Sequence, residues 1–168
     1  TNVPFIIAGP GIHPRQKPVE DLLTQPTIDL LPTLCELAGI PVPSSKPGIS
    51  LAPFLKGEKQ KRQHPYAASE WHSEYEVTVS PGRMIRSPRY KYTHYLEGNG
   101  EELYDMLKDK GERRNLAHDP KYSKILAEHR ALLDDYIRRT QDDYRSLKVE
   151  ADKRSVSYTH LGAHETKA

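Results

Sequence analysis

Residues 102–122, ELYDMLKDKGERRNLAHDPKY, combine a candidate strand, a turn around a glycine and the start of a helix. This stretch places Asp105, Asp109 and Glu112 around Gly111, and oxygen ligands around a glycine are how a calcium loop is built. The ligand spacing of such a loop is not matched, however, and basic residues stand among the carboxylates. The stretch therefore predicts a strand, then a tight turn whose Asp and Asn side chains accept backbone amides, then the approach to a helix.

That helix begins at Asp119 and Pro120, an N-cap residue followed by proline at the first helical position. Apolar side chains then recur at helical spacing: Tyr122, Ile125, Leu126, His129, Leu132, Leu133, Tyr136 and Ile137. The acidic pairs at 134–135 and 142–143 are expected on the solvent side of the helix. Because so long a stripe needs a sheet to lie on, the preceding strands are its expected partner.

Those strands lie between residues 65 and 107. The segments PYAASEWH, EYEVTVS, GRMIRSPRYKYTHYLE and EELYDML are rich in tyrosine and β-branched residues and are separated by turn signals, which predicts three or four antiparallel strands. In YKYTHY, residues 90–95, alternation places Tyr90, Tyr92 and His94 on one face. The predicted unit is a small antiparallel sheet of about four strands packed by a long C-terminal helix.

The first third of the chain has a different character. Residues 3–8 are a continuous apolar run, typical of a strand buried in a parallel sheet. Helical spacing follows over residues 27–38, with Pro32 at the start of a second helix and Gly39 just past its end. Cys35 lies on the apolar face, which favours a small buried hydrophobe over a nucleophile. The predicted fold class is α+β: the terminal strand and helix of a large α/β domain, then the antiparallel unit.

Composition excludes several functions. The 168 residues carry 25 basic and 23 acidic side chains, interspersed, which argues against a nucleic-acid partner. A single cysteine excludes an internal disulfide framework. No run of about 18 apolar residues is present, so no membrane span is predicted. The chain opens on TNVPFIIAGPG, without a start methionine or a signal peptide, and is expected to be part of something larger.

Candidate chemistry is sparse. None of the eight histidines forms a metal-ligand pair, and no phosphate loop, serine elbow or carboxylate pair of catalytic type is present. His72, beside Trp71 and Glu70 at a strand end, is either a structural histidine, which the residues favour, or a group that meets a substrate. A set of cations could bind anions, although strand alternation is expected to spread it over both faces: Arg83, Arg86, Arg89 and Lys91.

Five segments together resemble a known family. VPFIIAGPGI, IDLLPTLCELAGIPVP, GISLAPFL, RMIRSPRYKYTHY and ELYDMLKDKGERRNLAHDPKY are similar, in this order, to the C-terminal part of type I sulfatases of the alkaline-phosphatase-like superfamily. The likeness covers most of residues 3–137. The run SEWH…PGRMIRSPRYKY looks most like enzymes that act on sulfated sugars, such as heparan N-sulfatase.

The resemblance implies a layout. Residues 1–55 would end the large α/β domain, residues 56–145 would form the C-terminal subdomain, and residues 146–168 would be a mobile tail. In the family this subdomain closes one side of the substrate cleft. The resemblance therefore implies a set of substrate contacts: His72, Glu70, Trp71 and Arg83.

The resemblance also implies that the chemistry lies upstream. Family members hydrolyse sulfate esters or sulfamates with calcium and a formylglycine made from Cys or Ser in a Cys/Ser-x-Pro-x-Arg motif. Cys35 continues as Glu36-Leu37-Ala38-Gly39, which lacks the proline and the arginine. No catalytic or metal residue is thus expected in this chain, which would be inactive alone.

The expected partners follow from this layout: the upstream part of the same polypeptide and a sulfated carbohydrate, in a periplasmic or secreted parent enzyme. Self-association is expected of the isolated chain, because an apolar strand and helix must be covered. Two alternatives remain open. The chain could be a stand-alone anion- or carbohydrate-binding module, or part of a related phosphodiesterase or phosphonate-ester hydrolase.

Overall fold

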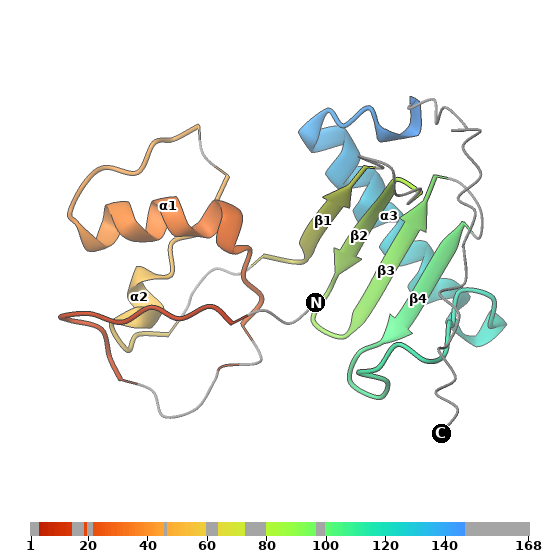
Figure 1. Cartoon of the computed structure of the whole chain (residues 1–168), viewed down its shortest axis with the longest axis horizontal. Coiled ribbons are helices and arrows are strands. Elements are labelled where there is room, and N and C mark those ends of the chain that lie inside the picture. Colours follow the sequence, from red (N-terminus) through yellow and green to blue (C-terminus); the bar gives the residue numbers. More distant parts are fainter. Residues whose placement is uncertain are drawn as a thin grey trace, which may run out of the picture.

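An antiparallel sheet with one long helix across it forms the larger part of the protein (Figure 1). The computed structural model describes residues 4–14, 19, 22–45, 47–59, 64–72, 80–96 and 100–146. The sheet has four strands in the order β1-β2-β3-β4, each antiparallel to the next: β1 (Ala67–Trp71), β2 (Gly82–Arg86), β3 (Tyr90–Tyr95) and β4 (Glu101–Asp105). The sheet predicted from the tyrosine-rich segments is confirmed.

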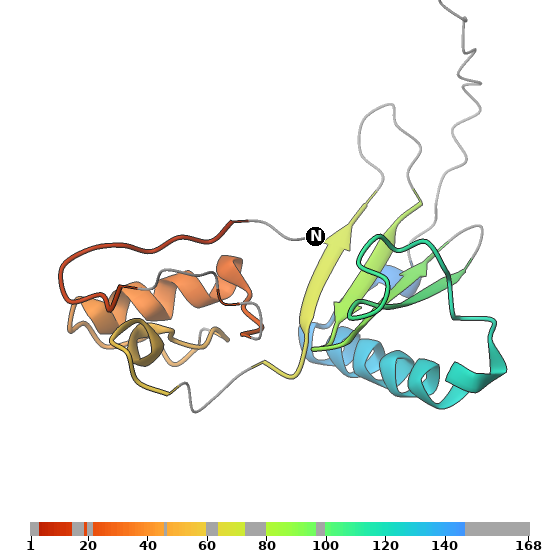
Figure 2. The ribbon, with the colours of Figure 1, turned by 90° about the horizontal axis from the view of Figure 1, so that it is seen from below.

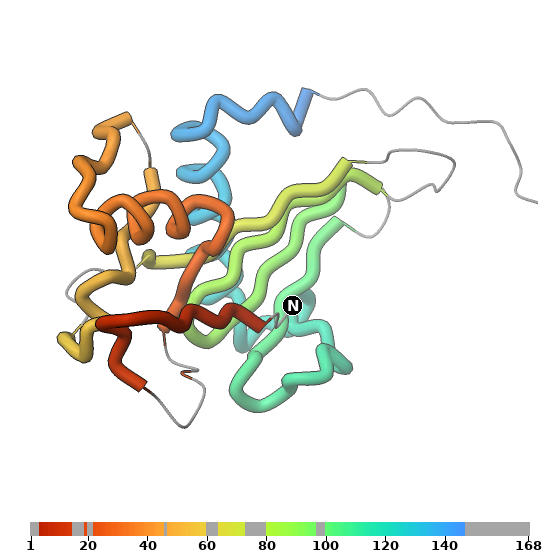
Figure 3. Tube along the Cα trace, turned by 60° about the vertical axis from the view of Figure 1, so that its left-hand side comes forward, coloured from red at the N-terminus to blue at the C-terminus, as the bar shows by residue number. Residues whose placement is uncertain are grey.

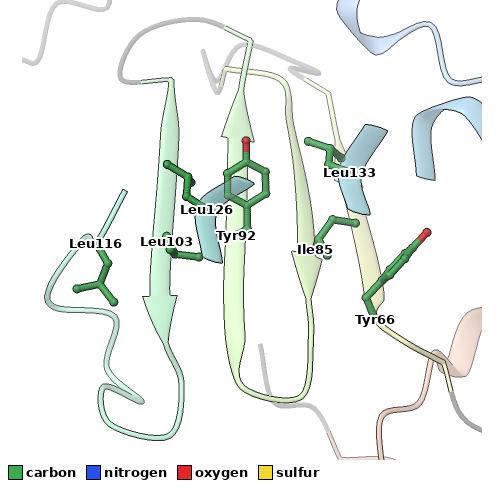
Figure 4. Packing of buried hydrophobic residues seen from close by; sticks show 7 residues of the cluster. All are labelled: Tyr66, Ile85, Tyr92, Leu103, Leu116, Leu126 and Leu133. Atoms are coloured by element: carbon green, nitrogen blue, oxygen red, sulfur yellow. The ribbon is translucent and has the colours of Figure 1, made fainter. Parts of the chain in front are cut away.

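The core lies between the sheet and the helix α3 (Ser123–Thr140) (Figures 2 and 4). Figure 4 shows strand side chains that face α3, among them Ile85, Tyr92 and Leu103, each at most 1% exposed. Leu126 and Leu133 meet them from the helix. Alternation along β3 is as predicted: Tyr92 faces the helix, and its neighbours in the strand, Lys91 and Thr93, face the other side of the sheet.

A capped 3-10 turn precedes α3, and a left-handed residue follows its last turn. The Asp119 carboxylate accepts a hydrogen bond from the Lys121 amide at 3.1 Å, and a 3-10 turn, η1 (Pro120–Tyr122), leads into α3. At the other end Gln141 adopts a left-handed conformation with φ of 55° and reverses the chain. The 3-10 turn η2 (Tyr144–Ser146) follows. Asp119 caps this turn as predicted, but the α-helix itself begins three residues later than Pro120, at Ser123, and it ends before the acidic residues at 142–143.

The turn around Gly111, between β4 and the approach to α3, has a structural role. Asp109 Oδ2 accepts from the amides of Arg113 and Arg114 at 2.8 and 2.9 Å. Asn115 Oδ1 accepts from the amide of Leu103 at 3.0 Å and so ties the turn to β4. Glu112 pairs with a lysine of β3. These carboxylate and amide oxygens are occupied by protein donors, which confirms the prediction of a capped turn.

The helix α1 (Pro26–Leu37) corrects one prediction. Pro32 lies inside a continuous helix and does not start a second one. The missing amide of Pro32 leaves the Ile28 carbonyl without its helical partner, and Gly48 packs against that carbonyl so closely that an added Cβ would lie 1.9 Å from the oxygen. The helix ends in a Schellman motif at Gly39, as predicted, with the Ile40 amide bonded to the Cys35 carbonyl at 2.8 Å.

The apolar positions of the first third differ from expectation as well. Residues 4–8 form no strand, because a strand needs a paired neighbour and the described residues supply none beside it. In α1 the apolar stripe is exposed, with Leu34 51% exposed, and Cys35 is only partly buried. The buried side of the helix carries Asp29 and Thr33, both 0% exposed.

These two buried polar side chains fasten the following segment to α1. Asp29 Oδ1 accepts from the Ile49 amide at 2.8 Å, and the Thr33 hydroxyl accepts from the Leu51 amide at 2.9 Å. The short helix α2 (Ala52–Leu55) starts directly afterwards. The polar face of α1 therefore satisfies backbone donors that would otherwise be buried without partners.

Further contacts join α1 to the chain that enters β1. Gln25 forms two bonds with backbone of that chain, from its Nε2 to the Tyr66 carbonyl (3.4 Å) and to its Oε1 from the Ala68 amide (3.1 Å). His64 Nε2 lies 2.7 Å from Asp29 Oδ1. Figure 2 shows the helical part beside the edge of the sheet that β1 forms.

Two predicted elements cannot be compared. The expected strand at 74–80 lies almost wholly outside the described residues, and so does the tail from residue 147 onward. Among the residues that are described, no helix has the length and apolar character needed to cross a membrane.

Candidate functional site

The guanidinium of Arg83 organises the end of the sheet where β1 finishes. The side chain is 1% exposed, and an arginine has five N–H donors. Nε and Nη2 donate to the two oxygens of Asp142 at 2.6 and 2.9 Å. Nη1 donates to the carbonyls of Trp71 (3.2 Å) and Gly82 (2.9 Å), and Nη2 also lies 3.3 Å from Nε2 of His72. These five contacts use the whole donor set.

The chain after α3 completes this arrangement. Gln141 turns the backbone, and the side chains of Asp142 and Tyr144 reach the sheet. Figure 3 shows the chain turning at the end of α3. The ring of Tyr144 lies under the guanidinium of Arg83, 4.4 Å from its carbon to the ring centroid. The Tyr144 hydroxyl donates to the carbonyl of His94 at 2.9 Å. Cation–π contact and two charge-assisted bonds thus hold a buried cation in place.

Electrostatics agree with this geometry. Hydrogen bonds from Arg83 hold the pKa of Asp142 below its usual value. Burial alone would lower the pKa of Arg83, but the hydrogen bonds and charge of Asp142 outweigh it and raise that pKa. Burial raises the pKa of Tyr144 to about 12. The ion pair is therefore fully charged at neutral pH, with a neutral phenol beneath it.

Trp71 occupies the opposite face of the same strand end. It pairs in register with Gly82, and a Cβ on that glycine would lie 2.1 Å from the indole ring. The indole thus crosses over the glycine and meets Tyr95 edge to face, with ring centroids 5.8 Å apart. Its Nε1 donates to the Ser80 carbonyl at 3.0 Å. The ring is half-buried and rigidly held.

The four predicted contacts lie at the same strand end, with Trp71 on one face of the sheet and Glu70 and Arg83 on the other, and they are not equally accessible. His72 and Glu70 are exposed, Trp71 is partly exposed, and Arg83 is buried with its donors occupied. The Glu70 carboxylate accepts a hydrogen bond from the Tyr136 hydroxyl, and this bond contributes, after burial, to raising the pKa of that tyrosine. Arg83 thus presents no donor to a ligand in this structure, while its three neighbours have atoms at the surface.

The other predicted cations are bound to neighbouring groups. Arg89 forms an ion pair with Asp105 at 2.7 Å. Lys91 pairs with Glu112, and Arg86 donates to the Ser87 carbonyl. As expected, Arg83 and Arg86 lie on opposite faces of the sheet, since three positions separate them along β2. These cations therefore form no shared anion site.

Sequence reasoning missed Asp142 and Tyr144. Asp142 was expected on the solvent side of the helix, and this is wrong: its side chain is 9% exposed and pairs with Arg83. The reason is that α3 ends at Thr140 and the chain then reverses. The only local signal was the loss of helical apolar spacing after Ile137, which does not show where a reversed chain points.

The described residues do not fit the calcium and formylglycine that the sequence resemblance implies for the parent enzyme. No group of three or more His, Cys, Asp or Glu side chains among them is placed to hold a metal ion. Cys35 lies near the end of α1 and lacks the flanking proline and arginine of the modification motif. The described residues therefore offer neither group a site.

Comparison with known proteins identifies the class to which this fold belongs. A solved 2-O glycosaminoglycan sulfatase superposes with a TM-score of 0.82 at 78% identity, over 88% of this chain and 32% of that one. The architecture is thus that of the C-terminal part of a sulfatase. Residues 1–139 match the family described as N-sulphoglucosamine sulphohydrolase, C-terminal, and the chain belongs to that family.

Two further proteins are similar to this chain, one in sequence and one in structure. The Delta 4,5-hexuronate-2-O-sulfatase of Bacteroides thetaiotaomicron is 76% identical over 95% of this chain and 33% of its own length. A phosphonate monoester hydrolase of Agrobacterium radiobacter is 27% identical with a TM-score of 0.54, over 67% of this chain and 24% of that one. The chain spans about a third of the length of the sulfatases it matches. The sulfatase resemblance seen in the sequence is confirmed.

Proposed function

We propose that this chain forms the C-terminal part of a sulfatase that removes a sulfate ester from a sulfated uronic acid saccharide. The observation that carries the proposal is the 76% identity, over 95% of the chain, with a hexuronate-2-O-sulfatase. The chain supplies scaffold and substrate contacts, and the nucleophile and the metal belong to another part of the parent enzyme. On its own the chain releases no sulfate.

The contacts are His72, Trp71 and Glu70. His72 and Glu70 are exposed at the end of β1, and the adjoining indole offers an apolar face of the kind that packs against sugar rings. Arg83 supports these groups from beneath and does not touch the saccharide, because its five donors are occupied. The end of β1 is therefore the proposed rim of the substrate cleft.

Binding to an unsaturated 2-O-sulfated uronic acid disaccharide tests this site. Calorimetry at low salt should show weak binding by the chain, and His72→Ala should weaken it about tenfold, the effect of losing one hydrogen bond to a charged group. His118→Ala, at an exposed histidine in the turn before α3, is the matched control and should bind as the parent chain does. Equal affinity of the two variants would remove His72 from the proposed site.

A phosphonate-ester hydrolase is the second candidate, favoured by the shared fold of the Agrobacterium enzyme. Its lower identity, 27% against 76%, places it behind the sulfatase. A stand-alone anion-binding module has less support, because Arg83, Arg89 and Lys91 are all engaged in ion pairs. The nucleophile motif of the parent polypeptide separates the two hydrolases directly.

The exposed stripe of α1 supports two further parts of the proposal. Leu30, Leu31 and Leu34 are 41%, 44% and 51% exposed, and a contiguous apolar face is normally covered. In the parent we propose that upstream chain covers it, and the isolated chain self-associates through it. Sedimentation should show oligomers that dissociate when Leu34→Glu is introduced; a strict monomer would refute the self-association.

The location of the parent enzyme is a separate part of the proposal. We propose a periplasmic or secreted parent, and cell fractionation tests that location.

A further inference from the structure

The contact between Arg83 and His72 determines which ring nitrogen of the histidine carries the proton. A guanidinium only donates hydrogen bonds, so the Nε2 of His72, 3.3 Å from Nη2, must act as the acceptor. An imidazole nitrogen accepts only when it carries no proton. The neutral ring must then hold its proton on Nδ1.

We infer that Arg83 is a positioning residue that fixes His72 as the Nδ1–H tautomer, so that this ring offers a donor to an acceptor oxygen of the saccharide. Among the described residues, no hydrogen bond to the Nδ1 atom of His72 is formed, and the side chain is exposed. The inference deepens the proposed function and rests on it for the identity of the ligand.

The remaining contacts of Arg83 explain why the guanidinium can serve this purpose. Asp142 takes two donors, and the carbonyls of Trp71 and Gly82 take two more, so four bonds fix the plane of the group before His72 is considered. The ring of Tyr144 closes the space beneath it. The fifth donor is thus aimed by buried, rigid neighbours, and an exposed ring is oriented from below.

The charged groups around His72 have opposite signs. Arg83 faces the ring at Nε2, and the Asp142 carboxylate lies directly behind the guanidinium. Glu70, two residues earlier on β1, points to the helix face, where the Tyr136 hydroxyl donates to it. The tautomer is therefore set by the direct hydrogen bond from Arg83, since neither carboxylate makes a hydrogen bond to the ring in the described part of the chain.

Nitrogen-15 NMR of the histidine-labelled chain at pH 8 tests the inference, with His72 assigned by comparison with His72→Ala. The expected spectrum of the parent chain has a protonated-type Nδ1 and an unprotonated-type Nε2 for His72. Arg83→Lys keeps the charge but not the fork of donors, and should shift His72 toward the Nε2–H form. Arg89→Lys, at an ion pair remote from His72, is the control and should leave the His72 signals unchanged.

The outcomes are distinct from those of the proposed function. A predominantly Nε2–H or charged His72 in the parent chain overturns the inference, and so does an unchanged tautomer in folded Arg83→Lys. If that variant does not fold, the spectrum of the parent chain alone decides. Titration with the sulfated disaccharide and with its desulfated form then tests the ligand. An Nδ1–H ring whose signals do not respond to either sugar contradicts the proposed function but supports the positioning role.

Discussion

Arg83 and Asp142 lie 59 residues apart in the sequence and form a two-bond ion pair that is almost wholly buried. The pair joins the second strand of the sheet to the chain that follows α3. It therefore fixes the chain that follows Gln141, and it also fixes the guanidinium that contacts His72. Scaffold and candidate site depend on the same interaction.

Breaking this pair should destabilise the chain strongly. Asp142→Ala leaves a buried cation uncompensated, a change that costs about 3–5 kcal/mol in free energy of unfolding. Urea denaturation followed by circular dichroism measures it. The control is Arg114→Ala, which removes an exposed pair with Asp119 and should cost no more than about 1 kcal/mol. Similar losses in the two variants would show that the Arg83–Asp142 pair is not buried in solution.

The same carboxylate predicts a dependence of stability on pH. The pKa of Asp142 is lower in the folded chain than in the unfolded chain, where it is about 3.9. Its contribution is complete above the unfolded value and is lost as the pH falls through the lower, folded value. The free energy gap between the parent chain and Asp142→Asn should be constant from pH 7 to about 5 and narrow below about 4. A gap that does not change down to the acid transition would contradict the assignment.

Gly82→Ala should displace Trp71 from the candidate site, and the fluorescence of this tryptophan reports the change directly. An added Cβ would lie 2.1 Å from the Trp71 ring, so the indole must leave its position. Because the chain has one tryptophan, the change reports on this site alone. We expect a red-shifted emission maximum and greater quenching by iodide. Gly9→Ala, where nothing lies within 4 Å of the added atom, should leave the emission unchanged; a Gly82→Ala spectrum equal to that control would show that the ring does not cover the glycine.

Replacing Asp29 should locally weaken the protection of backbone amides from hydrogen exchange. Its two oxygens accept from the amides of Gln25 and Ile49, at 2.7 and 2.8 Å, and Oδ1 also contacts His64. Asp29→Ala leaves these donors unsatisfied, at about 1–3 kcal/mol for each buried one. Hydrogen exchange should show faster exchange of the Ile49 amide, with amides of β3 unaffected. Glu36→Ala, on the exposed side of the same helix, is the control. Unchanged protection at Ile49 would mean that Asp29 does not hold this segment.

The sheet and α3 could be predicted from the sequence because their signals are local. Alternation in residues 90–95 and the stripe from Ile125 to Ile137 each lie within one element, and Asp119 caps the 3-10 turn that leads into the helix. The strand expected at residues 3–8 depended instead on neighbours that the described chain does not provide. The role of Pro32 depended on Gly48, a residue of another segment.

The candidate site was only partly predictable for the same reason. His72, Glu70 and Trp71 are adjacent in sequence, so their grouping at a strand end could be read directly. The burial of Arg83 could not, because it depends on a chain reversal at Gln141 that brings Asp142 to the sheet. A left-handed glutamine carries no sequence signal comparable to that of a glycine.

We propose that this chain supplies the scaffold and substrate contacts of a sulfatase, while the chemistry resides elsewhere in the parent enzyme. The most direct test is ion chromatography of free sulfate after incubation of the purified chain with calcium and the 2-O-sulfated disaccharide. We predict no sulfate above the level of buffer alone at any chain concentration. Sulfate release that rises in proportion to the concentration of the chain, and persists through repeated purification, would show that the chain itself carries a reaction centre.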